Sequence, residues 1–72
     1  MTEYLVIIEK AGGNYSAYSP DLPGCITTGK TPEETANNMR EAIEFHIEGL
    51  REHGEPVPPP TSSGELVDVA AA

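Results

Sequence analysis

The chain has 72 residues, with 4 lysines and arginines against 12 aspartates and glutamates, which gives a formal net charge of −8. A chain of this length forms one small domain and buries only roughly 60% of the surface that its unfolded form exposes. Association with copies of itself or with a partner is therefore expected to add stability. The negative charge argues against direct nucleic-acid binding, because phosphates repel it, and favours a basic protein partner.

Cysteine usage and the N-terminus exclude further classes of protein. The single Cys25 cannot form an internal disulfide, and one cysteine with two distant histidines makes no zinc-ligand pattern. The chain shows no basic segment followed by a long apolar run, so neither a signal peptide nor a membrane span is expected. We therefore predict a cytoplasmic protein without membrane contact, cofactor or metal.

Three short strands are predicted before the middle of the chain. Residues 3–10 form a β-branched, apolar run that is typical of a strand buried on both faces. A glycine-rich turn separates this run from a second strand at 15–19, which predicts an antiparallel hairpin. Residues 22–25, LPGC, have the proline and glycine positions of a type II turn and lead into a third strand at 25–28.

A long helix and a fourth strand are predicted in the second half. Thr31 and Glu34 form a capping box around Pro32, with the Glu34 side chain reaching back to the amide of Thr31, and Gly54 is a C-terminal stop. These signals predict a helix over 32–53. A proline-rich linker follows at 55–64, and an alternating pattern predicts a fourth strand at 65–69.

This element order, β-β-β-α-β, predicts a two-layer α+β domain. The first three strands form an antiparallel meander, and the fourth runs parallel to the first if it returns beside it through a right-handed crossover. The sheet order is then 3-2-1-4, with the helix packed on the sheet. Such an order explains why residues 3–10 are apolar on both faces.

The predicted helix carries an apolar stripe and a broad acidic arc. The stripe that is expected to pack on the sheet consists of Ala36, Met39, Ile43, Ile47 and Leu50. Six of the twelve acidic residues gather on the opposite arc: Glu33, Glu34, Glu41, Glu44, Glu48 and Glu52. On charge alone this arc is either a solvated helix face or a docking surface for a basic protein, and both interpretations stay open.

Phe45 lies outside the apolar stripe, beside the small residues Ala42 and Gly49. Single exposed aromatic residues often have no role, but an aromatic anchor on flatter surface is also typical of interfaces. Gly49 lowers helix propensity by about 1 kcal/mol relative to alanine. This cost is easier to explain if another segment or molecule approaches the helix backbone closely at Gly49. We predict self-association through these three residues.

The sequence gives little support for an enzyme. Glu9, Glu41 or Glu44, and Asp68 are the carboxylates that a strand–helix–strand metal site for phosphodiester hydrolysis would use, as in ribonuclease H. However, Glu9 lies at the end of its strand, and the helical wheel directs Glu41 and Glu44 away from the sheet. We predict no enzymatic activity, with a metal-dependent ribonuclease-H-like nuclease as the remote alternative.

Two motifs resemble the HicB-like antitoxins of bacterial and archaeal toxin–antitoxin systems. They are SPDLPGC at 19–25 and TGKTPEETA at 28–36, and the similarity continues through 41–43 to GEPVP at 54–58. The resemblance implies a degraded ribonuclease-H-like fold without its catalytic carboxylates. It also implies an antitoxin, dimeric or tetrameric, that binds and masks a small, basic, messenger-RNA-cleaving toxin of the HicA type.

The sequence departs from the family pattern after the predicted fourth strand. Many family members carry a C-terminal DNA-binding segment there, and none is expected here. An orphan oligomerisation or ligand-binding module of the same fold, without a toxin partner, is therefore the alternative function. The residues that we predict to bind the partner are acidic: Glu41, Glu44, Glu48, Glu52 and Asp21.

Overall fold

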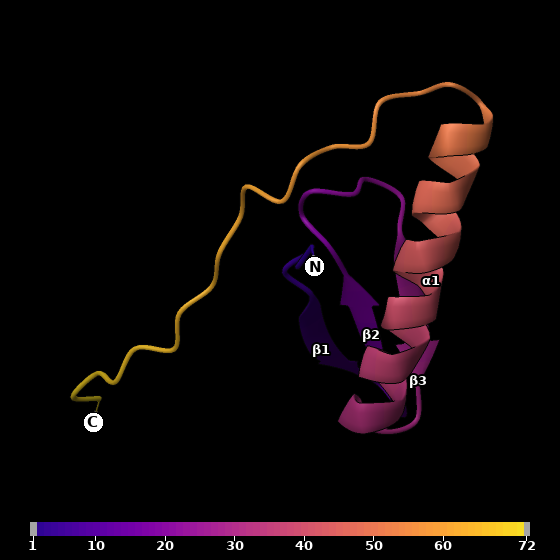
Figure 1. The fold of residues 1–72 in the computed structure, drawn as a ribbon. Helices are drawn as coiled ribbons and strands as arrows, with labels where there is room; N and C mark the ends of the chain where they lie inside the picture. Colours follow the sequence, from indigo (N-terminus) through magenta and orange to yellow (C-terminus); the bar gives the residue numbers. More distant parts are fainter. Residues whose placement is uncertain (1, 72) are drawn as a thin grey trace.

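Three antiparallel strands and one long helix make up the fold in the computed structural model, which describes residues 2–71. The strands are β1 (Ile7–Ala11), β2 (Asn14–Tyr18) and β3 (Ile26–Gly29), and the helix is α1 (Pro32–Glu52). The sheet order is β1-β2-β3, and α1 covers one face of the sheet (Figure 1). This confirms the predicted α+β class, the meander and the packed helix.

Glycines with positive φ make the two turns that shape the sheet. Gly12, with φ of 56°, lies in the two-residue turn between Ala11 and Asn14, which pair with each other in the ladder. Gly24, with φ of 83°, lies in the predicted type II turn, where the amide of Cys25 donates to the carbonyl of Leu22 at 3.1 Å. Glycine adopts this backbone region without the steric cost that a Cβ adds.

β1 is shorter than the predicted 3–10 because its partner strand ends early. Ile7 pairs with Tyr18, the last residue of β2. Two residues later Pro20 opens the next turn, and proline has no amide proton for a ladder. β2 and β3 lie within one residue of their predicted positions.

The predicted fourth strand at 65–69 is not formed in the described chain. From Glu65 onward the backbone is extended, exposed and directed away from the sheet (Figure 1). Leu66 is fully exposed, and Val67 and Val69 are 67% and 76% exposed. The alternating pattern predicts an extended conformation correctly, but it does not specify which edge the segment pairs with. β1 is therefore a free edge of the three-stranded sheet, in contrast to the predicted order 3-2-1-4.

The N-terminus of α1 has the predicted cap with one difference. The amide of Glu34 donates to the hydroxyl oxygen of Thr31 at 3.0 Å. The Glu34 carboxylate accepts from the amide of Lys30 at 3.3 Å, and not from the predicted amide of Thr31. The bond to Thr31 satisfies a donor in the first turn, where the helix itself offers no acceptor, and the bond from Lys30 fixes the residue just before the cap.

The C-terminus of α1 is closed by a glycine in the left-handed region. Gly54 has φ of 67°, and its amide donates to the carbonyl of Arg51 at 3.1 Å. The amide of Glu55 donates to the carbonyl of Leu50 at 2.9 Å. This pair of bonds is a Schellman motif, and it ends the helix at Glu52, one residue before the predicted end.

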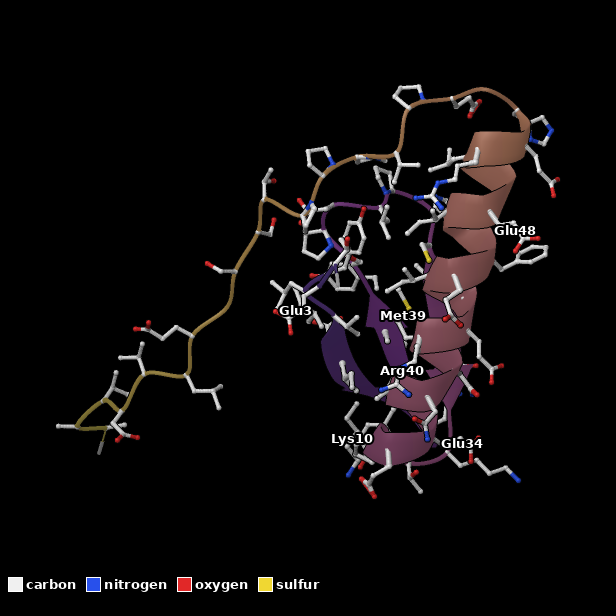
Figure 2. The ribbon with its side chains drawn as sticks, in the orientation of Figure 1. Glu3, Lys10, Glu34, Met39, Arg40 and Glu48 are labelled. Atoms are coloured by element: carbon white, nitrogen blue, oxygen red, sulfur yellow. The ribbon has the colours of Figure 1, made fainter. Side chains whose placement is uncertain are left out.

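The core lies between α1 and the sheet and is small. Its buried apolar residues are Ala17, Leu22, Cys25 and Met39, and Figure 2 shows Met39 pointing from α1 toward the sheet. Thr35 is also fully buried, although the predicted stripe places Ala36 there instead. The helix approaches β3 closely at this point, because a Cβ built on Gly29 would lie 2.5 Å from the hydroxyl oxygen of Thr35.

Candidate partner-binding surfaces

One side of the apolar stripe of α1 has no strand beneath it. Ala36 is exposed, and Ile43 and Ile47 are only half-buried. These three residues line a groove of about 560 Å³ along the free edge of β1, which we call the edge groove. The opposite wall of the edge groove is formed from the N-terminal segment and β1: Thr2, Glu3, Tyr4, Val6 and Ile8. The stripe predicted from the sequence is thus wider than a three-stranded sheet can cover.

A second groove, of about 600 Å³, adjoins the edge groove along α1. The two grooves share Thr2, Tyr4, Glu44 and Ile47. The remaining residues of the second groove are Glu48, Arg51, Glu52 and Val57. Three of the predicted partner-binding glutamates therefore surround apolar side chains, and we call this surface the acidic groove.

The acidic groove has the chemistry to hold a lysine or arginine side chain. Such a side chain packs its aliphatic stem on apolar surface while its charged head pairs with a carboxylate. Glu44, Glu48 and Glu52 are spaced four residues apart, so their like charges repel one another along the helix. A cationic partner relieves this repulsion. All three are exposed, and Figure 2 shows Glu48 on the side of α1 that faces away from the sheet.

The two other predicted partner-binding residues lie apart from the acidic groove. Glu41 is exposed on α1 but lines neither the acidic groove nor the edge groove. The Asp21 carboxylate accepts four hydrogen bonds, from the amide and hydroxyl of both Thr61 and Ser62, at 2.9 to 3.1 Å. The amide of Ser62 is the largest cause that lowers the pKa of Asp21. Asp21 anchors the linker, and its contact with a partner stays a prediction.

The linker is also held by the N-terminal segment. The Tyr4 hydroxyl donates to the carbonyl of Pro58 at 2.5 Å. A Cβ built on Gly64 would lie 3.2 Å from the Leu5 side chain, so the end of the linker also touches this segment. Tyr4 and Val57 were not predicted as groove residues. No local signal identifies them, because the contact joins residues 54 positions apart in the chain.

The predicted self-association residues share a groove on the opposite flank of α1. Phe45, which is 79% exposed, lines this groove of about 540 Å³ together with Ala42 and Gly49. We call it the aromatic groove. Ile26, on the edge strand β3, lines it as well, is 70% exposed and was not among the predicted residues.

Neither a metal cluster nor a membrane-spanning helix occurs within residues 2–71. No three histidine, cysteine, aspartate or glutamate side chains gather there as possible metal ligands. Of the carboxylates in the nuclease alternative, Asp68 lies in the exposed C-terminal segment and Glu9 is exposed on β1. In this part of the chain no helix combines the length and apolar character that crossing a bilayer requires.

Comparison with known proteins identifies the family. The model of a family described as HicB_like antitoxin of bacterial toxin-antitoxin system matches residues 4–71. The chain belongs to the HicB-like antitoxin family. The match includes the linker and the segment at 65–69 as well as the sheet and helix, so the exposed C-terminal segment is part of the family domain.

Several relatives of this HicB-like chain are similar over most of its length. A UPF0150 protein of Thermoplasma acidophilum is 47% identical over 57 residues, which cover 78% of this chain and 83% of the relative. A UPF0150 protein of Synechocystis sp. is 46% identical over 56 residues, 76% of this chain and 71% of the relative. A 14.9 kDa protein from the rep-hol intergenic region of Haemophilus phage HP1 is 46% identical over 55 residues, but these are only 41% of that protein. This chain therefore spans less than half of the phage relative.

A solved structure of a HicA3 and HicB3 toxin–antitoxin complex contains a chain of similar fold. The TM-score is 0.72 at 37% sequence identity, and the match covers 82% of this chain and 70% of that chain. The sequence family and the fold therefore agree, and both support a role in a toxin–antitoxin system.

Proposed function

We propose that this chain is an antitoxin module that binds and masks a small, basic, messenger-RNA-cleaving toxin of the HicA type. Its HicB-like family and its similarity to a chain of the HicA3–HicB3 complex support this role. The observation that carries the proposal is the acidic groove, in which Glu44, Glu48 and Glu52 surround apolar side chains. The module acts by occlusion in the cytoplasm, without catalysis and without a cofactor.

Electrostatics gives the acidic groove a way to block such a toxin. A protein that cleaves RNA needs lysine and arginine side chains to hold the phosphate backbone. Glutamates that pair with those side chains compete directly with the RNA. The formal net charge of −8 also accelerates the encounter with a basic toxin. The same charge repels RNA and DNA, so the module itself binds no nucleic acid.

We further propose that the complete domain has the degraded ribonuclease-H-like fold with a fourth strand parallel to β1. Two observations support this order. The edge groove leaves space beside β1, and half-buried Ile43 and Ile47 lie over that space. The family match extends to residue 71 and so includes the segment at 65–69.

Co-expression with the product of an adjacent small basic reading frame tests the proposed function. The toxin alone is expected to arrest growth, and co-expression of this chain is expected to restore growth. The two proteins are then expected to elute together from a sizing column. Growth arrest that this chain leaves unchanged, with no complex on the column, would overturn the proposal.

A second candidate function is an oligomerisation module of the same fold without a toxin. The aromatic groove favours it, because Phe45 and Ile26 are large, apolar and exposed on one surface. Phe45→Ser is then expected to weaken self-association in light scattering without affecting the capture of a toxin. Self-association that is unchanged in this variant counts against the aromatic groove as the contact.

A further inference from the structure

Within residues 2–71, two features lack a partner in the same molecule. The first is the exposed extended segment at 65–69, which we call the tail strand. Its apolar residues Leu66, Val67 and Val69 are all exposed. The second is the free edge of β1 together with the edge groove beside it. An exposed strand edge with apolar surface is a template for pairing with another strand.

The edge groove is built to receive a strand. β1 is paired on one side only, so its outward N–H and C=O groups are available for a further ladder. Ile8 on β1 and Ile43 and Ile47 on α1 line the space beside that edge. A strand laid there would cover the part of the apolar stripe that the three-stranded sheet leaves open.

The tail strand matches the edge groove in side-chain pattern. Successive side chains of a strand point to opposite faces, so Val67 and Val69 lie on one face and Leu66 and Asp68 on the other. The valines suit the apolar groove under α1. The amide of Ala71 donates to the carbonyl of Val69 at 3.0 Å, which ends the extended stretch at this point.

The tail strand is acidic, and the edge carries both signs of charge, because Glu3 and Glu44 line the edge groove and Glu9 lies in β1. Arg40 lines the edge groove and Lys10 lies in β1, so two of the four basic residues of the chain are at this edge (Figure 2). The tail strand carries Glu65 and Asp68. Arg40 and Lys10 offer partners to these two carboxylates, and the like charges of two tail strands oppose their pairing with each other.

The path of the chain directs the tail strand outward. Asp21 holds the linker at Thr61 and Ser62, and Gly64 rests on Leu5. Beyond Gly64 the chain runs away from its own sheet (Figure 1). The prolines of the preceding linker make that segment stiff, so it presents the tail strand to a neighbouring molecule.

We propose that the tail strand of one copy adds to the β1 edge of a second copy, and that two copies exchange their tail strands reciprocally. The exchange makes a two-fold dimer in which each copy gives one strand and receives one. It buries Val67 and Val69, fills the edge groove and enlarges a core of only a few buried apolar residues. Glu48 and Glu52 line the acidic groove and not the edge groove, so they stay accessible to a toxin.

Light scattering of the purified full chain tests the exchange. The wild-type chain is expected to have the mass of a dimer, and the double variant Val67→Asp, Val69→Asp that of a monomer. Both valines are exposed in the single chain, so circular dichroism is expected to show an unchanged helix signal. Ala71→Asp, which adds a charge just beyond the tail strand, is the control and stays dimeric. A monomeric wild-type chain, or a dimer that survives the valine substitutions, would overturn the proposal.

Cysteine cross-linking distinguishes exchange from a tail that returns to its own sheet. The double variant Ile8→Cys, Val67→Cys is expected to form a covalent dimer under mild oxidation on a non-reducing gel, and each single variant is not. Cys25 can stay in place, because its thiol is buried and burial raises its pKa. A disulfide-closed monomer, or the absence of a covalent dimer, would contradict the exchange. No toxin enters either experiment, so a failure here leaves the proposed function untouched.

Discussion

The linker at 55–64 and the tail strand at 65–69 are both extended, yet only the linker belongs to the packed domain. Tyr4 and Asp21 hold the linker through side-chain hydrogen bonds to Pro58, Thr61 and Ser62. Among the described residues, the tail strand makes no such bond to the sheet or helix, and its apolar side chains are exposed. An extended conformation alone does not attach a segment to a fold. Anchoring groups elsewhere in the chain decide which extended segment is held against the sheet and helix.

The largest loss of stability is expected from a methyl group that is added inside the packed region between α1 and the sheet. Gly29→Ala would put a Cβ 2.5 Å from the Thr35 hydroxyl oxygen and 2.8 Å from its backbone nitrogen. Overpacking of this kind is expected to reduce the free energy of unfolding by about 1–3 kcal/mol in urea denaturation. Gly13→Ala, in the turn between β1 and β2, is the control, because a Cβ there meets nothing within 4 Å, and it is expected to cost less than about 0.5 kcal/mol. Equal losses in the two variants would contradict a close approach of α1 to β3 at Gly29.

Removal of the Asp21 anchor is expected to leave the linker as weakly attached to the fold as the tail strand is. Asp21→Ala deletes the acceptor of four hydrogen bonds, so the amides of Thr61 and Ser62 are expected to exchange with solvent faster. Asp68→Ala, in the tail strand, is the matched control and is expected to leave their exchange unchanged. Hydrogen-exchange NMR measures both variants. Unchanged protection in Asp21→Ala would mean that other contacts hold the linker.

Acid is expected to release the same anchor without any substitution. The hydrogen bond from the Ser62 amide, followed by the other bonds, lowers the pKa of Asp21 from its ordinary value of 3.8. The ionised carboxylate therefore stabilises the folded chain above this ordinary pKa, and the contribution is lost as the pH falls through the lowered value. An NMR titration is expected to give an Asp21 midpoint below 3.8, with the Thr61 and Ser62 amides following it. A midpoint at or above 3.8 would contradict the anchor.

The smallest change in stability is expected from removing a polar group that is buried without a hydrogen-bond partner. The Ser19 hydroxyl is buried, and no hydrogen-bond partner is present for it among the described residues. Ser19→Ala removes this unsatisfied group, so the free energy of unfolding is expected to stay the same or rise by up to about 1 kcal/mol. Thermal denaturation measures the change. A clear loss of stability would show that the hydroxyl is satisfied, for example by water.

Local signals in the sequence predicted the parts of the fold that local chemistry determines. Gly12 and Gly24 identified the turns, and Thr31 with Glu34 identified the start of α1, because each acts within a few residues of itself. The pairing of the segment at 65–69 beside β1 stays a prediction, because alternation specifies an extended strand and not the edge that it joins.

For the candidate site as well, local patterns in the sequence were informative and contacts between distant residues could not be predicted. Helical periodicity placed six glutamates on one arc, and three of them, Glu44, Glu48 and Glu52, line the acidic groove. The contribution of Tyr4 and Val57 to that groove depends on packing between the two ends of the chain, and no spacing in the sequence reveals it. The bonds between Asp21 and the linker join residues 40 and 41 positions apart, so they could not be predicted either.

The affinity of the chain for the proposed toxin, measured with one charge reversed at a time, tests the central claim most directly. Glu48→Lys lies in the acidic groove, and Glu9→Lys makes the same change of charge on β1. The account predicts that Glu48→Lys weakens binding by about tenfold or more, while Glu9→Lys changes it by less than about threefold. Equal weakening by the two variants would show that only net charge matters, and it would contradict the acidic groove as the toxin-binding surface.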